Sequence, residues 1–190
     1  TGCWTNHHSV VEYKGQWYLF YHNNYYSPKF DKNRSVCADS LFFNADGTIR
    51  KVIPTFRGIG VTTASDTIHI DRYSKIGKNT SIAFLDSANT FEGWKTDLKT
   101  KGAWIQYNCV DFGTKGLHKI IARLNSQTNG TLQIRINSLN GPVIAQINIP
   151  SDKDWTLVQS PVIKYYKGIH NLYVVLSKGD NTNVNWLIFK

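Results

Sequence analysis

The sequence contains no methionine, only three cysteines and only five prolines. No apolar run approaches the roughly 18 residues that a membrane-spanning helix requires, so we expect no membrane span. Charged residues make up 18% of the chain and hydrophobic residues 41%, a globular composition that excludes a disordered tail. Because the chain lacks an initiator methionine and opens on an aromatic and histidine-rich segment, we expect it to be a piece of a longer protein.

The three cysteines, Cys3, Cys37 and Cys109, form neither an even set nor the CxxC spacing of a metal site. They are expected to be buried or free thiols, with a bridge between Cys3 and Cys37 as the alternative.

The net charge of +9 raises the question of nucleic-acid binding. Residues 1–56 hold 6 Lys/Arg and 4 Asp/Glu, giving +2, and residues 57–190 hold 16 and 9, giving +7. Apart from Lys95, Lys99 and Lys101, the basic residues alternate with acids. This dispersal favours a solubility feature over a phosphate-binding track.

Apolar and polar residues alternate with period 2, as in Leu132, Ile134 and Ile136, which is typical of half-buried β-strands. Turn dipeptides separate such runs, and no stretch has helical periodicity. The fold class is therefore all-β. The turn dipeptides are Lys14-Gly15, Asp46-Gly47, Asn129-Gly130 and Asn140-Gly141.

A weakly patterned connection between Val52 and Thr67 predicts two domains, 1–56 and 57–190, with the boundary near Arg57. The first is too small to be stable alone, whereas the second has the size and eight or nine strands of a β-sandwich. In the first domain we expect a long hairpin and a shorter pair: Val10–Tyr13 with Gln16–His22, and Ser35–Phe43 with Thr48–Ile53.

Four motifs follow one another in the first domain: Thr5-Asn6-His7-His8-Ser9, Trp17-Tyr18-Leu19-Phe20-Tyr21-His22, Arg34-Ser35 and Asn44-Ala45-Asp46-Gly47-Thr48-Ile49. Their order resembles the closing blade of family 43 glycoside hydrolases, especially arabinoxylan arabinofuranosidases. The resemblance implies a five-bladed β-propeller that hydrolyses glycosidic bonds with inversion, using two Asp and one Glu in earlier blades. None of the acids present matches them, so this chain alone is expected to be inactive. Those acids are Glu12, Asp31, Asp39 and Asp46.

The resemblance implies that Arg34 reaches sugar hydroxyls in the propeller pocket, where its planar set of donors suits vicinal hydroxyls. The alternative is a surface ion pair with Asp31 or Asp39. It also implies that the segment with Asn6, His7 and His8 approaches the propeller axis. Asn6 and His7 are then candidate ligands of an axial cation, and His8 is a candidate substrate-binding residue.

A longer series of motifs fills the second domain, and all seven occur in order. They are Gly102-Ala103-Trp104, Val110-Asp111-Phe112-Gly113, Ala122-Arg123-Leu124, Gly141-Pro142-Val143-Ile144, Ile149-Pro150, Lys167-Gly168-Ile169-His170 and Asn183-Val184-Asn185-Trp186. The series is similar to that of family 6 carbohydrate-binding modules. The resemblance implies a β-jelly-roll sandwich that binds xylan-like or glucan chains in a cleft formed by loops.

Three sugar-binding residues are carried over from this resemblance. Trp155, in the polar loop that begins at Ser151, would stack on a sugar face, and Asn183, in the loop before the last strand, would bond its hydroxyls. The usual second aromatic is replaced by Leu98, and only Trp94 is close enough in sequence to substitute for it. Two further tryptophans in predicted strands are expected in the core: Trp104 and Trp186.

A structural calcium ion is also implied, with Asp71 and Asn185 at the ligand positions. The pair is one acid short of the family pattern, so we expect the site to be weak or empty. No organic cofactor is expected.

Together these features predict a secreted, periplasmic or cell-surface bacterial enzyme that releases arabinose or xylose, a monomer held on plant cell-wall polysaccharide by its module. Two alternatives remain: a stand-alone glycan-binding module, and a basic nucleic-acid-binding β-sandwich.

Overall fold

The computed structural model describes residues 7–24 and 34–190, and the chain divides into two compact units, Thr1–Ile59 and Gly60–Lys190. The division lies three residues after the expected boundary. Each unit is described by itself below. Among the described residues, helical structure is limited to one 3-10 turn, η1 (Thr90–Glu92), and no helix is long and apolar enough to cross a membrane.

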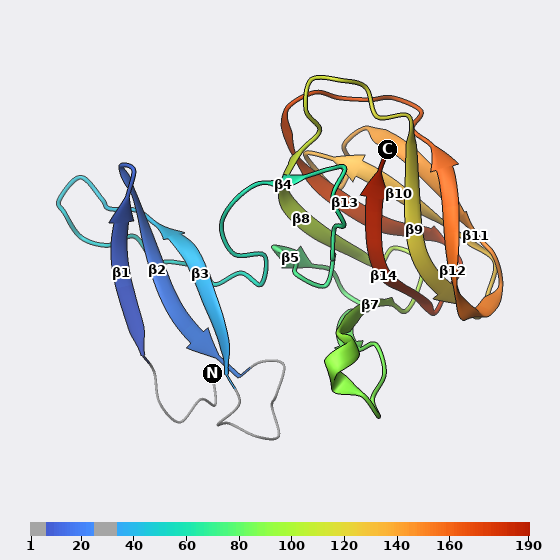
Figure 1. The fold of residues 1–190 in the computed structure, drawn as a ribbon, viewed down its shortest axis with the longest axis horizontal. Helices are drawn as coiled ribbons and strands as arrows, with labels where there is room; N and C mark the ends of the chain where they lie inside the picture. Colours follow the sequence, from blue (N-terminus) through green and yellow to red (C-terminus); the bar gives the residue numbers. More distant parts are fainter. Residues whose placement is uncertain (1–6, 25–33) are drawn as a thin grey trace. The chain divides into compact units, whose positions relative to one another are not determined.

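The first unit contains a three-stranded antiparallel sheet of β1 (His8–Tyr13), β2 (Gln16–Asn23) and β3 (Ser35–Leu41), in that order (Figure 1). The predicted hairpin between β1 and β2 is confirmed. Its turn residues Lys14 and Gly15 both have positive φ, 52° and 78°, as a two-residue hairpin turn requires.

The second predicted pair of the first unit is confirmed only next to its turn, where Phe43 bridges Ile49 and the Arg50 N–H donates to the Phe42 carbonyl oxygen. β3 pairs with β2, and residues 48–53 contribute a single bridge, Phe43 to Ile49. Asp46 Oδ1 accepts hydrogen bonds from both the backbone N–H and the hydroxyl of Thr48, and this Asx-type turn reverses the chain between Phe43 and Ile49.

The first unit has a small core. Leu41 is 2% exposed, but large apolar side chains remain accessible on both faces of β1, because Val10 and Val11 point to opposite sides and are 40% and 43% exposed. Trp17, at 39%, meets Phe43 only edge to face. This burial is what the sequence led us to expect of a unit too small to be stable alone.

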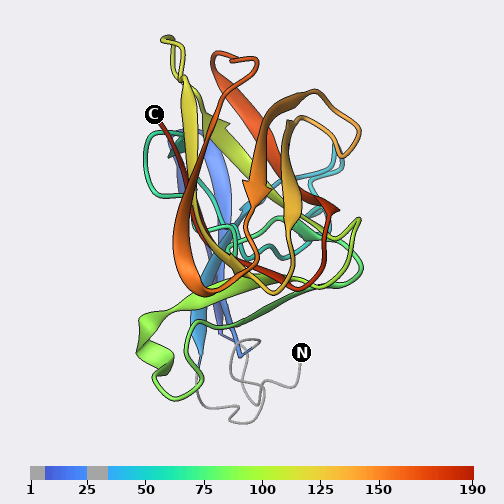
Figure 2. The same ribbon diagram turned by 90° about the vertical axis from the view of Figure 1, so that its right-hand side faces the viewer.

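The second unit is a sandwich of two antiparallel-dominated sheets (Figure 2). One sheet has six strands in the order β11-β10-β13-β8-β4, with β5 on β8, and the other has five in the order β12-β9-β14-β7-β6. The strand bounds are β4 (Thr62–Thr63), β5 (Lys75–Ile76), β6 (Thr80–Phe84), β7 (Trp94–Leu98), β8 (Trp104–Asp111), β9 (Lys119–Ser126), β10 (Gly130–Ile136), β11 (Val143–Ile149), β12 (Asp152–Pro161), β13 (Ile169–Lys178) and β14 (Thr182–Phe189).

The core of the sandwich follows the period-2 pattern of the sequence. Leu132, Ile134 and Ile136 of β10 are fully buried on one face of the strand, as expected of the inward face of a sandwich sheet. The expectation that two tryptophans lie in this core is wrong. Trp104 and Trp186 lie in β8 and β14 as predicted, but both are half-buried, because Ile105 and Leu187 take the adjacent inward positions.

One glycine in the second unit is fixed by a close backbone approach. A Cβ on Gly141, in the predicted Asn140-Gly141 turn, would overlap the carbonyl oxygen of Ile136. We expect Gly141→Ala to reduce the free energy of unfolding by about 1–3 kcal/mol, because the backbone must move. A thermal melt would show a Tm lower by roughly 3–10 °C. Gly116→Ala is the control, since its nearest neighbour is the Tyr165 ring at 3.3 Å; equal effects at both glycines would contradict the explanation.

Candidate functional site

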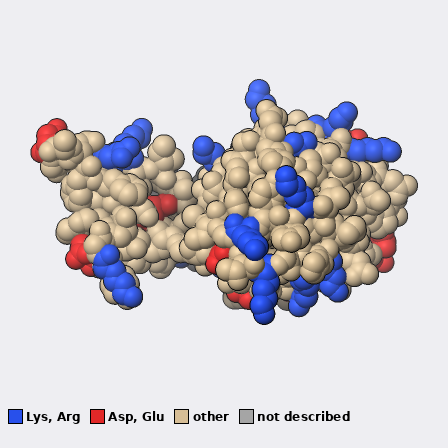
Figure 3. All heavy atoms as spheres, turned by 90° about the horizontal axis from the view of Figure 1, so that it is seen from above, with Lys and Arg blue, Asp and Glu red and all other residues tan. Residues whose placement is uncertain are grey.

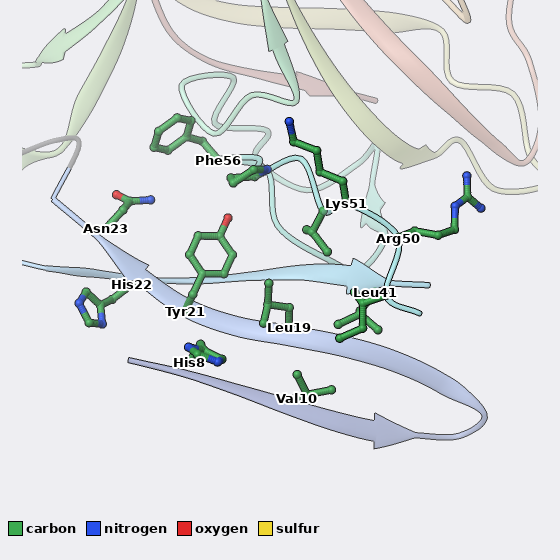
Figure 4. A pocket seen from close by; sticks show the side chains of 13 residues that line it. His8, Val10, Leu19, Tyr21, His22, Asn23, Leu41, Arg50, Lys51 and Phe56 are labelled. Carbon is green, nitrogen blue, oxygen red and sulfur yellow. The ribbon is translucent and has the colours of Figure 1, made fainter. Parts of the chain in front are cut away.

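The first unit contains a cavity of about 680 Å³ (Figure 4), and His8, one of the predicted propeller residues, lines it. His8 lies on its wall with Tyr21 and His22, and the rest of the lining is largely apolar. Arg34 is exposed just before β3 and is not among the described lining residues. The structure therefore does not bring Arg34 and His8 together in this cavity.

The candidate axial ligands of the first unit are only partly described. Asn6 lies outside the described residues. His7 is exposed, and its ring is 5.9 Å from the ring of His22. Among the described residues, no group of three or more His, Cys, Asp and Glu side chains is placed to hold a metal ion.

Asp39 holds the segment beside this cavity in place. Its buried carboxylate accepts hydrogen bonds from the Tyr21 hydroxyl at 2.6 Å and from the N–H and hydroxyl of Thr55 at 3.0 and 2.6 Å. Burial, and then the bond to this carboxylate, raise the pKa of Tyr21 far above its ordinary value, so the phenol remains a neutral donor. Asp39 therefore acts structurally, and the described ion pairs do not include one between it and Arg34.

The cysteines described in the structure, Cys37 and Cys109, are free thiols. Burial, followed by the nearby Asp39 carboxylate, raises the pKa of Cys37. The alternative bridge needs Cys3, which lies outside the described residues.

In the second unit, Trp155 lies on the outer face of the five-stranded sheet, not in a loop. It belongs to β12, at an irregularity between Asp152 and Thr156 in the pairing with β9. The indole is half-buried, and the guanidinium carbon of Arg123 lies 5.1 Å from its ring centroid. The prediction that Trp155 lies in a loop was therefore wrong. The polar residues before it belong to the irregular start of β12 and do not form a separate loop.

A hydrogen-bonded chain runs from Arg123 across the sheet. Arg123 Nη1 donates to Asn185 Oδ1 at 2.7 Å, and Asn185 Nδ2 donates to the carbonyl oxygen of Trp94 at 3.0 Å. Asn185 is the extra residue of a β-bulge between Val184 and Trp186, which explains how one side chain reaches both neighbouring strands. The chain links β9, β14 and β7.

Asn183 joins the same face, but from within β14, so its predicted loop position is wrong. Its Nδ2 donates to Asn125 Oδ1 at 2.8 Å, and Asn125 Nδ2 donates to the carbonyl oxygen of Lys153 at 3.1 Å. Across the sheet Asn183 pairs with Asp97. Trp155, Arg123, Asn125 and Asn183 thus form a group on adjacent strands, which we call the outer-face group.

The proposed second aromatic does not belong to this group. Trp94 lies on the same face of β7 as the buried Thr96 and Leu98, so it points toward the inner side of the sheet. There its ring stacks on Phe84 at a centroid distance of 4.1 Å. Leu98 is fully buried and would not present an aromatic to solvent at its position.

Residues 72–190 match the profile of the family described as carbohydrate binding module (family 6). The chain belongs to the family 6 carbohydrate-binding modules. A family 6 module from Clostridium cellulolyticum, solved in complex with xylose, is 26% identical with a TM-score of 0.59, and the match covers 68% of this chain and 99% of that one.

Two larger relatives match both units of the chain, the first unit as well as the module. An arabinoxylan arabinofuranohydrolase from Paenibacillus polymyxa is 25% identical over 203 residues, covering 94% of this chain but 30% of the relative. The structure of a Bacillus subtilis glycoside hydrolase family 43 arabinoxylan arabinofuranohydrolase in complex with cellotetraose has a TM-score of 0.67 at 24% identity and covers 98% and 41%. The chain thus spans about a third of the P. polymyxa relative.

The hydrogen bonds of Asn185 do not fit the calcium site expected in the module. Asp71 is 5% exposed, and its Oδ1 is 4.0 Å from His69 Nδ1. Asn185, however, uses its carbonyl oxygen to accept from Arg123 and its amide to donate to Trp94. Calcium takes six to eight oxygen ligands, and here a cationic guanidinium already bonds one of the expected two. Calcium binding remains a prediction that this arrangement does not favour.

Two members of the outer-face group, Arg123 and Asn125, were not predicted from the sequence. The signal was present: Arg123 and Asn125 alternate with the buried Ala122 and Leu124, which places both on the outside of β9. What the sequence did not supply was the neighbour on β12, because the irregular pairing there changes which residue lies beside Arg123.

Asp97 beside Asn183 gives the module a pH dependence. Burial raises the pKa of its carboxyl, against the opposing effect of Lys95, whose Nζ is 3.6 Å away. The folded state therefore holds the proton more tightly than the unfolded chain, and the charged carboxylate lowers stability at neutral pH. We expect Asp97→Asn to raise Tm by only about 1–3 °C at pH 7, because solvent screens a half-buried group. Near pH 3.5 the carboxyl is largely protonated in both the folded and the unfolded state, so the substitution should change Tm little. A Tm difference that is the same at both pH values in melts would argue against this.

Proposed function

We propose that the module binds xylan-type plant polysaccharide through the outer-face group. The observation that carries this proposal is the Trp155 indole beside the Arg123 guanidinium, with the bonded pair Asn125 and Asn183 on the adjacent strands of the same sheet face. A pyranose presents a flank of C–H groups to an aromatic ring and a rim of hydroxyls to amides and guanidinium groups. The xylose complex of the C. cellulolyticum module supports the choice of sugar.

Within the group, each residue has a separate role. Trp155 supplies the stacking surface with the part of its ring that Arg123 leaves uncovered. Asn183 and Asn125 are held by their mutual hydrogen bond, so their remaining polar capacity is oriented before the sugar arrives. Such preorganisation reduces the ordering cost of binding.

We further propose that the chain is part of a glycoside hydrolase that releases arabinose or xylose from plant hemicellulose and acts outside the cell. The first unit would then be the closing propeller blade, with Arg34 and His8 facing substrate and Asn6 and His7 near the axis. The names of the P. polymyxa and B. subtilis relatives support this enzyme context. Holding the enzyme on the polymer raises the local substrate concentration even when each contact is weak.

Isothermal titration of the full chain with xylohexaose and soluble arabinoxylan tests the binding proposal. Binding with a Kd between about 1 mM and 1 μM is expected, nearly unchanged between 50 and 300 mM NaCl for the neutral oligosaccharide. The absence of binding to either ligand would reject it.

A basic nucleic-acid-binding sandwich has less support. On the face shown in Figure 3, the Lys and Arg side chains are spread among neutral surface and form no continuous track. A phosphate-binding protein would gather such charges along one path.

A further inference from the structure

We infer that the outer-face group selects glycans that carry a carboxylate, as on a uronic acid substituent, and that the Arg123 guanidinium recognises this carboxylate. The inference rests on the proposed function, because it names the class of sugar that this same site prefers. It concerns Arg123, whose bonding is unusual for a half-buried arginine.

Arg123 uses one of its donor groups within the described part of the chain. Nη1 donates to Asn185 Oδ1, and the guanidinium carbon lies over the Trp155 ring, 5.1 Å from its centroid. The ion pairs there are His69 with Asp71 and Lys95 with Asp97, so no described carboxylate lies within 4.0 Å of this guanidinium. Nε and Nη2 remain as an adjacent pair of donors, the geometry that accepts both oxygens of one carboxylate.

Arg135 shows what a structural arginine does in the same module. It lies on the outer face of the other sheet, half-buried like Arg123. There Nε and Nη2 both donate to Gln133 Oε1, at 3.2 and 2.6 Å, and Nη1 donates to the Gly141 carbonyl oxygen at 3.0 Å. Arg135 thus bonds its Nε and Nη2 donors within the fold, whereas the same two donors of Arg123 are available to a ligand.

The position of Arg123 favours a sugar-borne anion. Its stacking on Trp155 fixes the guanidinium beside the ring on which the sugar would stack, so one ligand meets both groups. Nearby acids have other partners: Asp97 pairs with Lys95, and Asp152 Oδ1 accepts the N–H of Asp154. Residues 57–190 carry a net charge of +7, from 16 basic and 9 acidic residues, and this positive charge favours the approach of an acidic polymer.

The test compares one polymer with and without its charge. The full chain is titrated with glucuronoxylan and with the same glucuronoxylan after chemical reduction of its carboxyl groups to alcohols. We expect the acidic polymer to bind about tenfold more tightly or better at 50 mM NaCl, as a charge-assisted pair of hydrogen bonds implies. The ratio should decrease toward one in 500 mM NaCl. Free glucuronate should compete, and glucose at the same concentration should not.

Variants assign the effect to one side chain. Arg123→Gln should reduce the acid-to-reduced ratio to about one, Arg123→Lys should retain only part of it, and Arg135→Gln should leave it unchanged. Melting curves of each variant establish that it is folded, and the lysine variant decides the matter if the glutamine variant is not.

Three results would overturn the inference: equal binding of both polymers by the unmodified chain, an Arg123→Gln variant that weakens both polymers equally, or binding of DNA and heparin as tight as that of the acidic xylan. In the first two cases the proposed xylan binding still stands. It fails separately if neither glucuronoxylan, reduced glucuronoxylan nor neutral arabinoxylan binds.

Discussion

Trp155→Ala is expected to abolish retention of the chain on insoluble xylan and to weaken binding of soluble xylan about 30- to 150-fold. Stacking a sugar on the indole removes on the order of 100 Å² of apolar surface from water, worth roughly 2–3 kcal/mol at about 25 cal/mol per Å². The variant also removes the ring against which the Arg123 guanidinium packs, so the orientation of that donor is lost as well. Pull-down on insoluble xylan and calorimetry with xylohexaose measure the two effects.

The matched control is Trp155→Phe, which keeps a smaller ring at the same place in β12. It should retain a substantial part of the affinity, because a phenyl ring still offers a face to the sugar and to Arg123. If Trp155→Ala binds xylan as well as the unmodified chain, the outer-face group is not the binding site.

Phe189→Ala is expected to have the largest effect on stability, a loss of about 3–5 kcal/mol from a total of roughly 5–15 kcal/mol. Phe189 is fully buried near the end of β14, where its ring meets Phe112 edge to face at 5.1 Å. Its truncation leaves a cavity that the surrounding strands cannot close, since the Phe189 backbone N–H is also fixed by the carbonyl oxygen of Ala64. Urea unfolding followed by tryptophan fluorescence measures the loss.

Phe91→Ala provides the comparison for this prediction. Phe91 lies in η1 and is 98% exposed, so removing the same ring there should change the midpoint of unfolding by almost nothing. Similar losses at both positions would mean that Phe189 contributes little packing.

The buried half of the sandwich was predictable because alternation is a local signal. The alternation of Leu132, Ile134 and Ile136 with polar residues is enough to predict a buried strand face, and each of the three is fully buried in β10. The hairpin at Lys14 and Gly15 was predictable for the same reason, since two residues decide the turn. The family was predictable from the order of its landmarks, which the match over residues 72–190 confirms.

The outer face was harder to predict because bulges change the alternation of side chains along a strand. Nothing in the sequence around Asn185 says which residue is the extra one, so Trp186 was expected inside and lies half-exposed. In the same way, the irregular start of β12 made it impossible to predict from the sequence that Trp155 lies beside Arg123. The contacts of Asp39 with Thr55 were also out of reach, because they join residues 16 positions apart through a segment without regular structure.

The bulge at Asn185 separates β14 into two segments with opposite parity. Before it the even-numbered residues Thr182 and Val184 face the core, and after it the odd-numbered Leu187 and Phe189 do. Deleting this one residue would restore a single parity and leave Thr182, Val184, Leu187 and Phe189 on the core face, but it would remove the side chain that bonds Arg123 and the Trp94 carbonyl oxygen. Point substitutions at Asn183 leave the alternation of β14 intact, which makes the outer face a suitable place for redesign of glycan specificity, while an insertion or deletion elsewhere in this strand would move one segment's buried side chains to the outer face.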